Sequence, residues 1–170
     1  MEKLIMESNE LLFFLTTMGD IDRVLEIEQH EENSKFVFNW SKDAHIKAVE
    51  DSNWLHITIK RREDSVIIGY IILRGMENDD DSLELTRIVI SDKGKGYGRE
   101  SIRFVKNLCF DEMGCHRLWL DVFDYNIAAM KLYEAEGFVE EGILRECKKI
   151  NGKYYSMKVF SILSNEYFVR

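Results

Sequence analysis

The chain has 170 residues and a formal net charge of −8, with 45% hydrophobic and 32% charged residues. This length and composition suit one folded domain and exclude a disordered polypeptide, so we expect a single domain over residues 1–170. The acidic balance disfavours a nucleic-acid partner, and no apolar run approaches the roughly 20 residues that span a bilayer.

The cysteines and histidines point to neither a disulfide framework nor a metal. Three cysteines are an odd number, and with four scattered histidines they lack the spacing of zinc ligands, so we expect no metal. The first residues carry Glu2 and Glu7 and lack the apolar core of a secretion signal. We therefore expect a cytoplasmic protein that binds no membrane.

The N-terminal half alternates strand-like and helix-like patterns. The apolar run Leu11–Met18 predicts a first strand, a helix begins at Asp20, and Ser41–Asp51 predicts a second helix with its first residue as N-cap. Trp54–Lys60 alternates apolar and polar residues, which predicts a half-exposed strand. Val66–Leu73 is continuously apolar, as expected of a buried inner strand.

The segment from Asp20 to Glu32 is strongly acidic, with one arginine among six carboxylates. One interpretation is a solvated helix face with acids near the positive end of the helix dipole. The other is an acidic mouth for a polyamine or another free amine. In that second interpretation Glu28, Glu31 and Glu32 bind the substrate.

The C-terminal half continues the alternation. A helix extends to about Glu112, Arg117–Phe123 is a strand, and Asn126 caps a further helix that Gly137 closes. Phe138–Lys149 and Lys153–Leu163 flank an Asn-Gly pair, the strongest short hairpin signal. The element order predicts a mixed α/β sheet with helices on its faces.

The stretch from Leu83 to Glu100 joins a β-branched strand to a helix through glycines at alternate positions, Gly94, Gly96 and Gly98. The first N–H groups of a helix lack internal partners, and the helix dipole favours an anion there. Glycines let the backbone approach that anion closely. The stretch therefore predicts a phosphate-binding turn.

Two common nucleotide motifs do not fit this turn. A P-loop needs two glycines five apart followed by Lys and Ser or Thr, and a dinucleotide fingerprint needs a third glycine or alanine three after the second. The pattern that fits is Arg/Gln-x-x-Gly-x-Gly/Ala, filled here by Lys93 to Gly98 with lysine at its first position. Here the chain resembles the GNAT superfamily of N-acetyltransferases, and Asn126 to Phe138 resembles that family's Asn-x-x-Ala-x-x-Leu-Tyr-x-x-x-Gly-Phe helix.

The resemblance extends over essentially the whole chain. It implies an α/β (α+β) fold with a mostly antiparallel central sheet of about seven strands and helices on both faces. It also implies acetyl-CoA as cosubstrate, with the pyrophosphate on the glycine turn and the pantetheine arm along the preceding strand. The residues implied for the cofactor are Ile88, Val89, Ile90, Lys93, Gly94, Lys95, Gly96, Tyr97, Gly98, Arg99, Asn126 and Tyr133.

The resemblance also suggests catalytic residues. Tyr133 occupies the family's tyrosine position and would protonate the leaving thiolate, whereas a purely structural tyrosine would only pack on the sheet. Glu84 is a candidate general base, with an ordinary surface carboxylate as the alternative. Regular strand alternation would place Glu84, Thr86, Ile88 and Ile90 on one face.

The tail from Gly137 to Glu146 and the hairpin resemble the branch that contains spermidine acetyltransferases and ribosomal-protein N-terminal acetyltransferases. Ser156 departs from that branch, where many members have aspartate. The resemblance implies acetyl transfer to a primary amine, either of a polyamine or of a protein N-terminus. A non-catalytic acyl-CoA-binding sensor is the alternative, and a homodimer is possible because many relatives dimerise.

Overall fold

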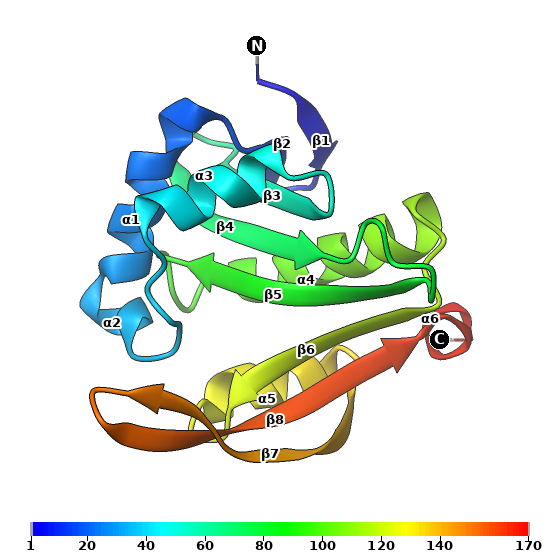
Figure 1. Cartoon of the computed structure of the whole chain (residues 1–170). Helices are drawn as coiled ribbons and strands as arrows, with labels where there is room; N and C mark the ends of the chain where they lie inside the picture. The colour runs from blue at the N-terminus through cyan, green and yellow to red at the C-terminus, as the bar shows by residue number, and fades with distance from the viewer. Residues whose placement is uncertain (1, 170) are drawn as a thin grey trace.

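The computed structural model describes residues 2–169, in which eight strands form one sheet in the order β1-β2-β3-β4-β5-β6-β8-β7 (Figure 1). The strands are β1 (Leu4–Glu7), β2 (Leu11–Leu15), β3 (Trp54–Arg61), β4 (Ile67–Arg74), β5 (Ser82–Ile90), β6 (Arg117–Phe123), β7 (Val139–Ile150) and β8 (Lys153–Leu163). The helices are α1 (Ile21–Gln29), α2 (Glu31–Ser34), α3 (Lys42–Glu50), α4 (Tyr97–Asn107), α5 (Ile127–Ala135) and α6 (Ser164–Phe168). The predicted mixed, mostly antiparallel fold is confirmed, with one strand more than expected.

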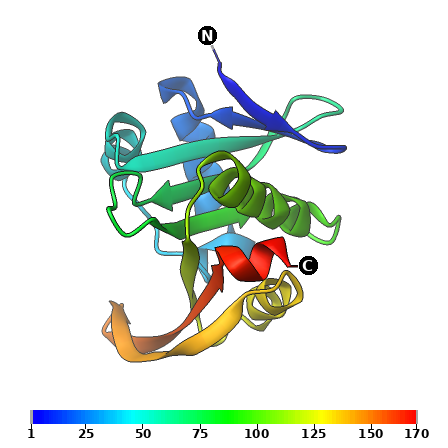
Figure 2. The same ribbon diagram turned by 90° about the vertical axis from the view of Figure 1, so that its right-hand side faces the viewer.

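Helices cover both faces of the sheet (Figures 1 and 2). On one face, Val24 and Ile27 of α1 pack against Tyr70 and Val89 of β4 and β5. The larger core lies on the other face, where α4 and α5 pack against the sheet and Phe104 stacks on Phe13 with ring centroids 3.8 Å apart. The β7–β8 hairpin extends beyond both layers.

The first strand differs from the prediction. The sheet begins with β1, which the sequence pattern did not indicate, and β2 ends at Leu15 instead of Met18. Thr17 then leads into a single 3₁₀ turn, Met18–Asp20, where the side chain of Asp20 accepts hydrogen bonds from the backbone N–H and hydroxyl of Thr17. Helix α1 begins after this turn, close to the predicted position.

Strand β3 is not half-exposed, which makes that prediction wrong. His56, Ile57, Thr58, Ile59 and Lys60 are all buried. The alternation of polar and apolar residues usually marks a solvated face, but here α3 packs against the strand, and its His45 contacts His56. Its polar side chains therefore lie inside the protein and need internal partners.

Strands β5 and β6 form the parallel pair of this sheet, and their contact is short. The paired residues are Ser82 with Arg117, Leu83 with Leu118, and Glu84 with Trp119. Beyond these pairs the two strands diverge (Figure 1). The divergence leaves the facing edges of two central strands without a neighbouring strand.

Candidate active site

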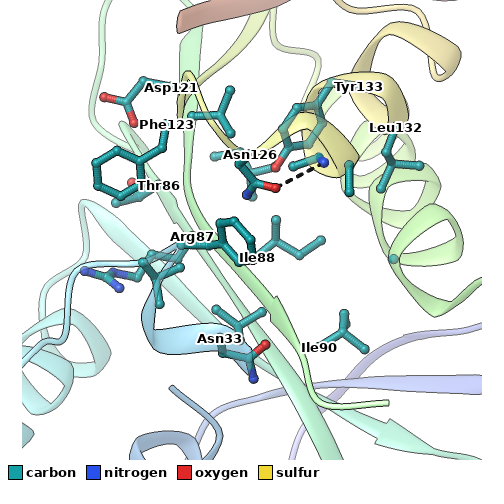
Figure 3. Close-up of a pocket in the computed structure, with 18 of the residues that line it drawn as sticks. Asn33, Thr86, Arg87, Ile88, Ile90, Asp121, Phe123, Asn126, Leu132 and Tyr133 are labelled. Carbon is teal, nitrogen blue, oxygen red and sulfur yellow. Dashed lines mark hydrogen bonds between the residues drawn. The ribbon is translucent and has the colours of Figure 1, made fainter. Parts of the chain in front are cut away.

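A cleft with a volume of about 930 Å³ occupies the opening between β5 and β6. Most of its lining comes from β5, the glycine turn, the start of α4, the end of β6, α5, and α2 with the segment that follows it (Figure 3). Most residues that the sequence predicted for the cofactor contribute to this lining. The cleft therefore brings together the two motifs that the sequence contains, although they lie some distance apart along the chain.

The glycine turn forms one end of the cleft. Gly94 and Gly96 have φ values of 75° and 84°, in the left-handed region that favours glycine, and Gly96 is the N-cap of α4. No atom lies within 4 Å of a Cβ built on either glycine, so a ligand can approach the backbone there. The first N–H groups of α4 meet this open space, which suits an anion.

Two predicted cofactor residues, Lys95 and Arg99, do not line the cleft, and their side chains form ion pairs. The ammonium group of Lys95 lies 3.2 Å from the carboxylate of Asp92, and Nε of Arg99 lies 3.5 Å from that of Glu136. The side chain of Lys93 does line the cleft, where burial lowers the pKa of its ammonium group.

The two walls of the cleft differ in origin. Ile88, Val89 and Ile90 of β5 line one wall, and Asn126 and Tyr133 line the other. Asn126 accepts a hydrogen bond from the backbone N–H of Ala129 at 3.3 Å, so its side chain caps α5 as predicted.

Tyr133 lies on the inner side of α5, with its ring among those of Phe138 and Phe160. It is 7% exposed, and its hydroxyl group points into the cleft (Figure 3). Burial, with a smaller contribution from the charge of Asp121, raises the pKa of Tyr133 well above its usual value near 10. The hydroxyl group therefore keeps its proton at neutral pH.

A β-bulge in β5 changes which residues share a face. Glu84 pairs with Arg74 and Leu85 with Leu73, but the next paired residue is Arg87, so Thr86 is extra. Leu85 consequently packs in the same core as Ile88 and Ile90, and Glu84 shares the opposite face with Arg87. The prediction that Glu84, Thr86, Ile88 and Ile90 lie on one face is wrong.

The bulge places Glu84 in the cleft together with Asp121, a residue that the sequence analysis did not single out. Burial raises the pKa of both carboxyl groups, and the charge of Asp121 raises the pKa of Glu84 further. The alternation of β6, with Leu120 and Val122 in the core, is the signal that could have indicated Asp121.

Glu28 departs from both interpretations of the acidic segment. Its side chain is 0% exposed, and its carboxylate accepts hydrogen bonds from the hydroxyl of Tyr70, the guanidinium of Arg87 at 3.1 Å and the backbone N–H of Trp40 at 2.5 Å. Burial alone would raise the pKa of Glu28, but His45, Arg87 and Tyr70 together lower it. Glu28 is neither solvated nor part of the cleft lining.

The other two predicted substrate contacts differ from each other. Glu32 lines the cleft, whereas Glu31 is exposed outside it.

The buried cluster continues through two histidines. His45 Nε2 lies 3.4 Å from Glu28, its Nδ1 lies 3.0 Å from His56 Nε2, and the hydroxyl of Thr16 lies 2.8 Å from His56 Nδ1. Burial lowers the pKa of His56 to about 3, and the charges of His45 and Arg87 act in the same direction. The imidazole of His56 is therefore neutral in the folded protein.

This burial predicts that the folded protein loses stability in mild acid. The unfolded chain binds a proton at His56 near its ordinary pKa of 6.5, whereas the folded chain does so only near 3. Above pH 6.5, His56 is neutral in both states, and its protonation does not affect stability. As the pH falls from 6.5 toward 3, the unfolded chain takes up a proton that the folded chain does not. The free energy of unfolding therefore falls by roughly 3 kcal/mol between pH 7 and pH 4. Urea denaturation at a series of pH values measures this loss.

Two variants assign the pH dependence to its source. His56→Gln cannot take up a proton and should flatten the profile of unfolding free energy against pH. His116→Gln removes an exposed imidazole and should leave the profile of the parent protein unchanged. A His56→Gln profile as steep as that of the parent protein would contradict the assignment.

Among residues 2–169, no group of three or more histidines, cysteines, aspartates or glutamates is arranged to hold an ion. In the same part of the chain, no helix has both the length and the apolar character needed to cross a membrane.

Comparisons with known proteins agree with this geometry. A family model described as an acetyltransferase (GNAT) domain matches residues 15–159. A probable N-acetyltransferase of Bacillus subtilis is 28% identical over 155 residues, which are 89% of this chain and 75% of that protein. Spermidine N(1)-acetyltransferase of Vibrio cholerae is 40% identical over 78 residues, which are 46% of this chain and 45% of that protein.

Solved structures of acetyltransferases are also similar to this chain, over nearly its full length. Spermidine N-acetyltransferase from Vibrio cholerae, solved in complex with CoA and spermine, superposes with a TM-score of 0.83 and 26% sequence identity. The superposition covers 95% of this chain and 99% of that one. Another structure of the Vibrio cholerae enzyme, described as dodecameric, gives a TM-score of 0.79 at 26% identity, over 94% of this chain and 97% of that one.

Proposed function

The chain belongs to the GNAT family of acetyltransferases, and from this premise we propose that its cleft divides into a cofactor half and an acceptor half. The protein is an acetyl-CoA-dependent N-acetyltransferase that moves an acetyl group to an amine. The residues at the two ends of the cleft support this division. The cleft has a glycine-lined helix N-terminus at one end and the paired carboxyl groups of Glu84 and Asp121 at the other.

In the cofactor half, the proposed contacts follow from the backbone. The N–H groups at the start of α4 would hold the pyrophosphate, and the open space at Gly94 and Gly96 admits it without a steric conflict. Lys93 would add a positive charge beside it. Ile88 to Ile90 have no neighbouring strand on the cleft side and would pair with the pantetheine arm. Bound acetyl-CoA supplies an acetyl group activated as a thioester.

In the acceptor half, Glu84 and Asp121 would bind the amine and accept its proton. An alkyl amine has a pKa near 10 and enters mostly as an ammonium ion, so it must lose a proton before it can attack. Carboxyl groups whose pKa is raised by burial are stronger bases than ordinary ones. As the amine nitrogen bonds to the acetyl carbon, the carbon–sulfur bond breaks. The Tyr133 hydroxyl would then protonate the departing sulfur.

Two acceptor classes fit this site, namely polyamines and protein N-terminal amines. The name of the Vibrio cholerae relative supports a polyamine. The acidic segment from Asp20 to Glu32 gives less support for a polyamine than the number of its acids suggests, because Glu28 is enclosed and Glu31 lies outside the cleft. Glu32 is the one acid of the predicted trio that we retain as a proposed contact for the acceptor. A homodimer stays a prediction.

Incubation of the full chain with acetyl-CoA and a panel of amines tests the proposal. The panel contains polyamines, aminoglycosides and N-terminal peptides, and release of the free thiol reports turnover. We expect turnover with at least one primary amine and a higher melting temperature in the presence of acetyl-CoA. A rise in melting temperature with no turnover on any amine would favour the non-catalytic sensor instead.

A further inference from the structure

The acceptor half of the cleft contains cations as well as carboxylates. Arg74 and Lys148 both line it, and within residues 2–169 neither has a carboxylate oxygen closer than 4 Å. The chain as a whole carries a net charge of −8. Two cations without a close ion-pair partner in one cleft of such an acidic protein therefore need an explanation.

Aromatic rings hold both cations in place. The guanidinium of Arg74 lies over the ring of Trp54 at 5.1 Å from the centroid, and the ammonium of Lys148 lies over the ring of Phe38 at 5.1 Å. Cation–π contacts of this kind fix a long side chain without neutralising its charge. Both positive charges therefore remain available to a ligand that enters the cleft.

The cations lie beside the proposed ammonium site. Glu84 on β5 is directly opposite Arg74 on β4, which brings the two Cβ atoms to roughly 5 Å. Burial raises the pKa of Glu84 and Asp121, and the charge of Lys148 opposes the rise at both carboxyl groups. The acceptor half thus presents two carboxylates and two cations within the reach of one small molecule.

A further hydrogen-bond donor borders the same cleft. Arg87 also lines the cleft, and its side chain is 6% exposed. One edge of the guanidinium is held by Glu28, and the face lies over Trp40 at 4.5 Å from the centroid. Its Nε is buried without a hydrogen-bond partner in the described part of the chain. Such a donor is costly to bury unless a ligand or water satisfies it.

We infer that the acceptor is a primary amine that also carries a carboxylate, with its ammonium at Glu84 and Asp121 and its carboxylate at Arg74 and Lys148. This inference rests on the proposed function and narrows its acceptor class. A polyamine would bring a second ammonium group toward Arg74 and Lys148, where like charges repel. An amine with a carboxylate meets an opposite charge at both ends.

Two sources share this chemistry, a free amino acid and a peptide with an acidic residue beside its N-terminus. The experiment measures kcat/KM by thiol release for three peptides that differ only at their second residue, which is Glu, Gln or Lys. Free amino acids and spermidine form two further arms. We expect the Glu peptide to exceed the Gln peptide by about tenfold and the Lys peptide by more, as for a charge-assisted contact.

Substitutions locate the source of the preference. Arg74→Gln and Lys148→Gln should each remove most of the advantage of the Glu peptide over the Gln peptide. The matched control Lys47→Gln removes one exposed positive charge from α3, outside the cleft, and should preserve the full preference. Charge reversal in Arg74→Glu should shift the preference toward the Lys peptide.

The arms separate the possible outcomes. Higher kcat/KM for free amino acids than for the Glu peptide would assign the carboxylate to the amino acid itself. A preference for spermidine or for the Lys peptide would overturn the inference and leave the proposed acetyl transfer intact. No turnover in any arm, including spermidine, would contradict the proposed function instead.

Discussion

Replacement of Tyr133 by phenylalanine is expected to lower kcat about 100-fold or more, with Kd for acetyl-CoA changed by less than about twofold. The substitution removes the hydroxyl group and keeps the ring that packs against Phe138 and Phe160. The pKa of Tyr133 is raised by burial, so the hydroxyl group retains the proton that a leaving thiolate needs. Steady-state kinetics and calorimetric titration with acetyl-CoA measure the two quantities separately.

A tyrosine far from the cleft provides the control for this experiment. Tyr167→Phe removes a hydroxyl group that hydrogen-bonds Asp111 near the C-terminal helix, and it should leave kcat and Kd unchanged. If Tyr133→Phe weakened acetyl-CoA binding as strongly as it lowered kcat, the hydroxyl group would act in binding and not as an acid.

Replacement of Glu28 by glutamine is expected to reduce the free energy of unfolding at pH 7 by about 3 kcal/mol. The change removes the negative charge that balances Arg87 in a buried site and leaves that guanidinium without a counter-ion. The pKa of Glu28 is lowered in the folded protein. Its stabilising contribution is therefore complete above the ordinary value of 4.5 and is lost as the pH falls through the folded-state value.

The same helix supplies a matched control. Glu26→Gln removes a carboxylate that forms an exposed ion pair with Arg23, and it should change the free energy of unfolding by less than about 0.5 kcal/mol. Urea denaturation compares the two variants at pH 7. A Glu28→Gln protein of parental stability whose KM for the acceptor is raised would restore Glu28 as a substrate contact.

Local signals predicted much of the fold correctly. The Asn-Gly pair at residues 151–152 forms the expected hairpin, and Ser41 caps α3 by accepting from the N–H of Ala44. Asn126 caps α5 in the same way. Each of these features depends on residues within a few positions of one another, so the sequence contains the necessary information.

The features that the sequence did not predict depend on distant partners. Glu28 appears to be one acid among many in an acidic helix, but Tyr70 and Arg87 enclose it from 42 and 59 positions away. The bulge at Thr86 lies in a run that matches a regular strand, and only its pairing with β4 reveals the extra residue. Asp121 became a candidate only once the fold placed it in the same cleft as Glu84.

The short seam between β5 and β6 also has a mechanical consequence. Three residue pairs join these strands, so backbone pairing between β1 to β5 and β6 to β8 is confined to one short stretch of the sheet. A ligand that occupies the cleft contacts residues from both parts of the sheet at once and so links them where no strand pairing does.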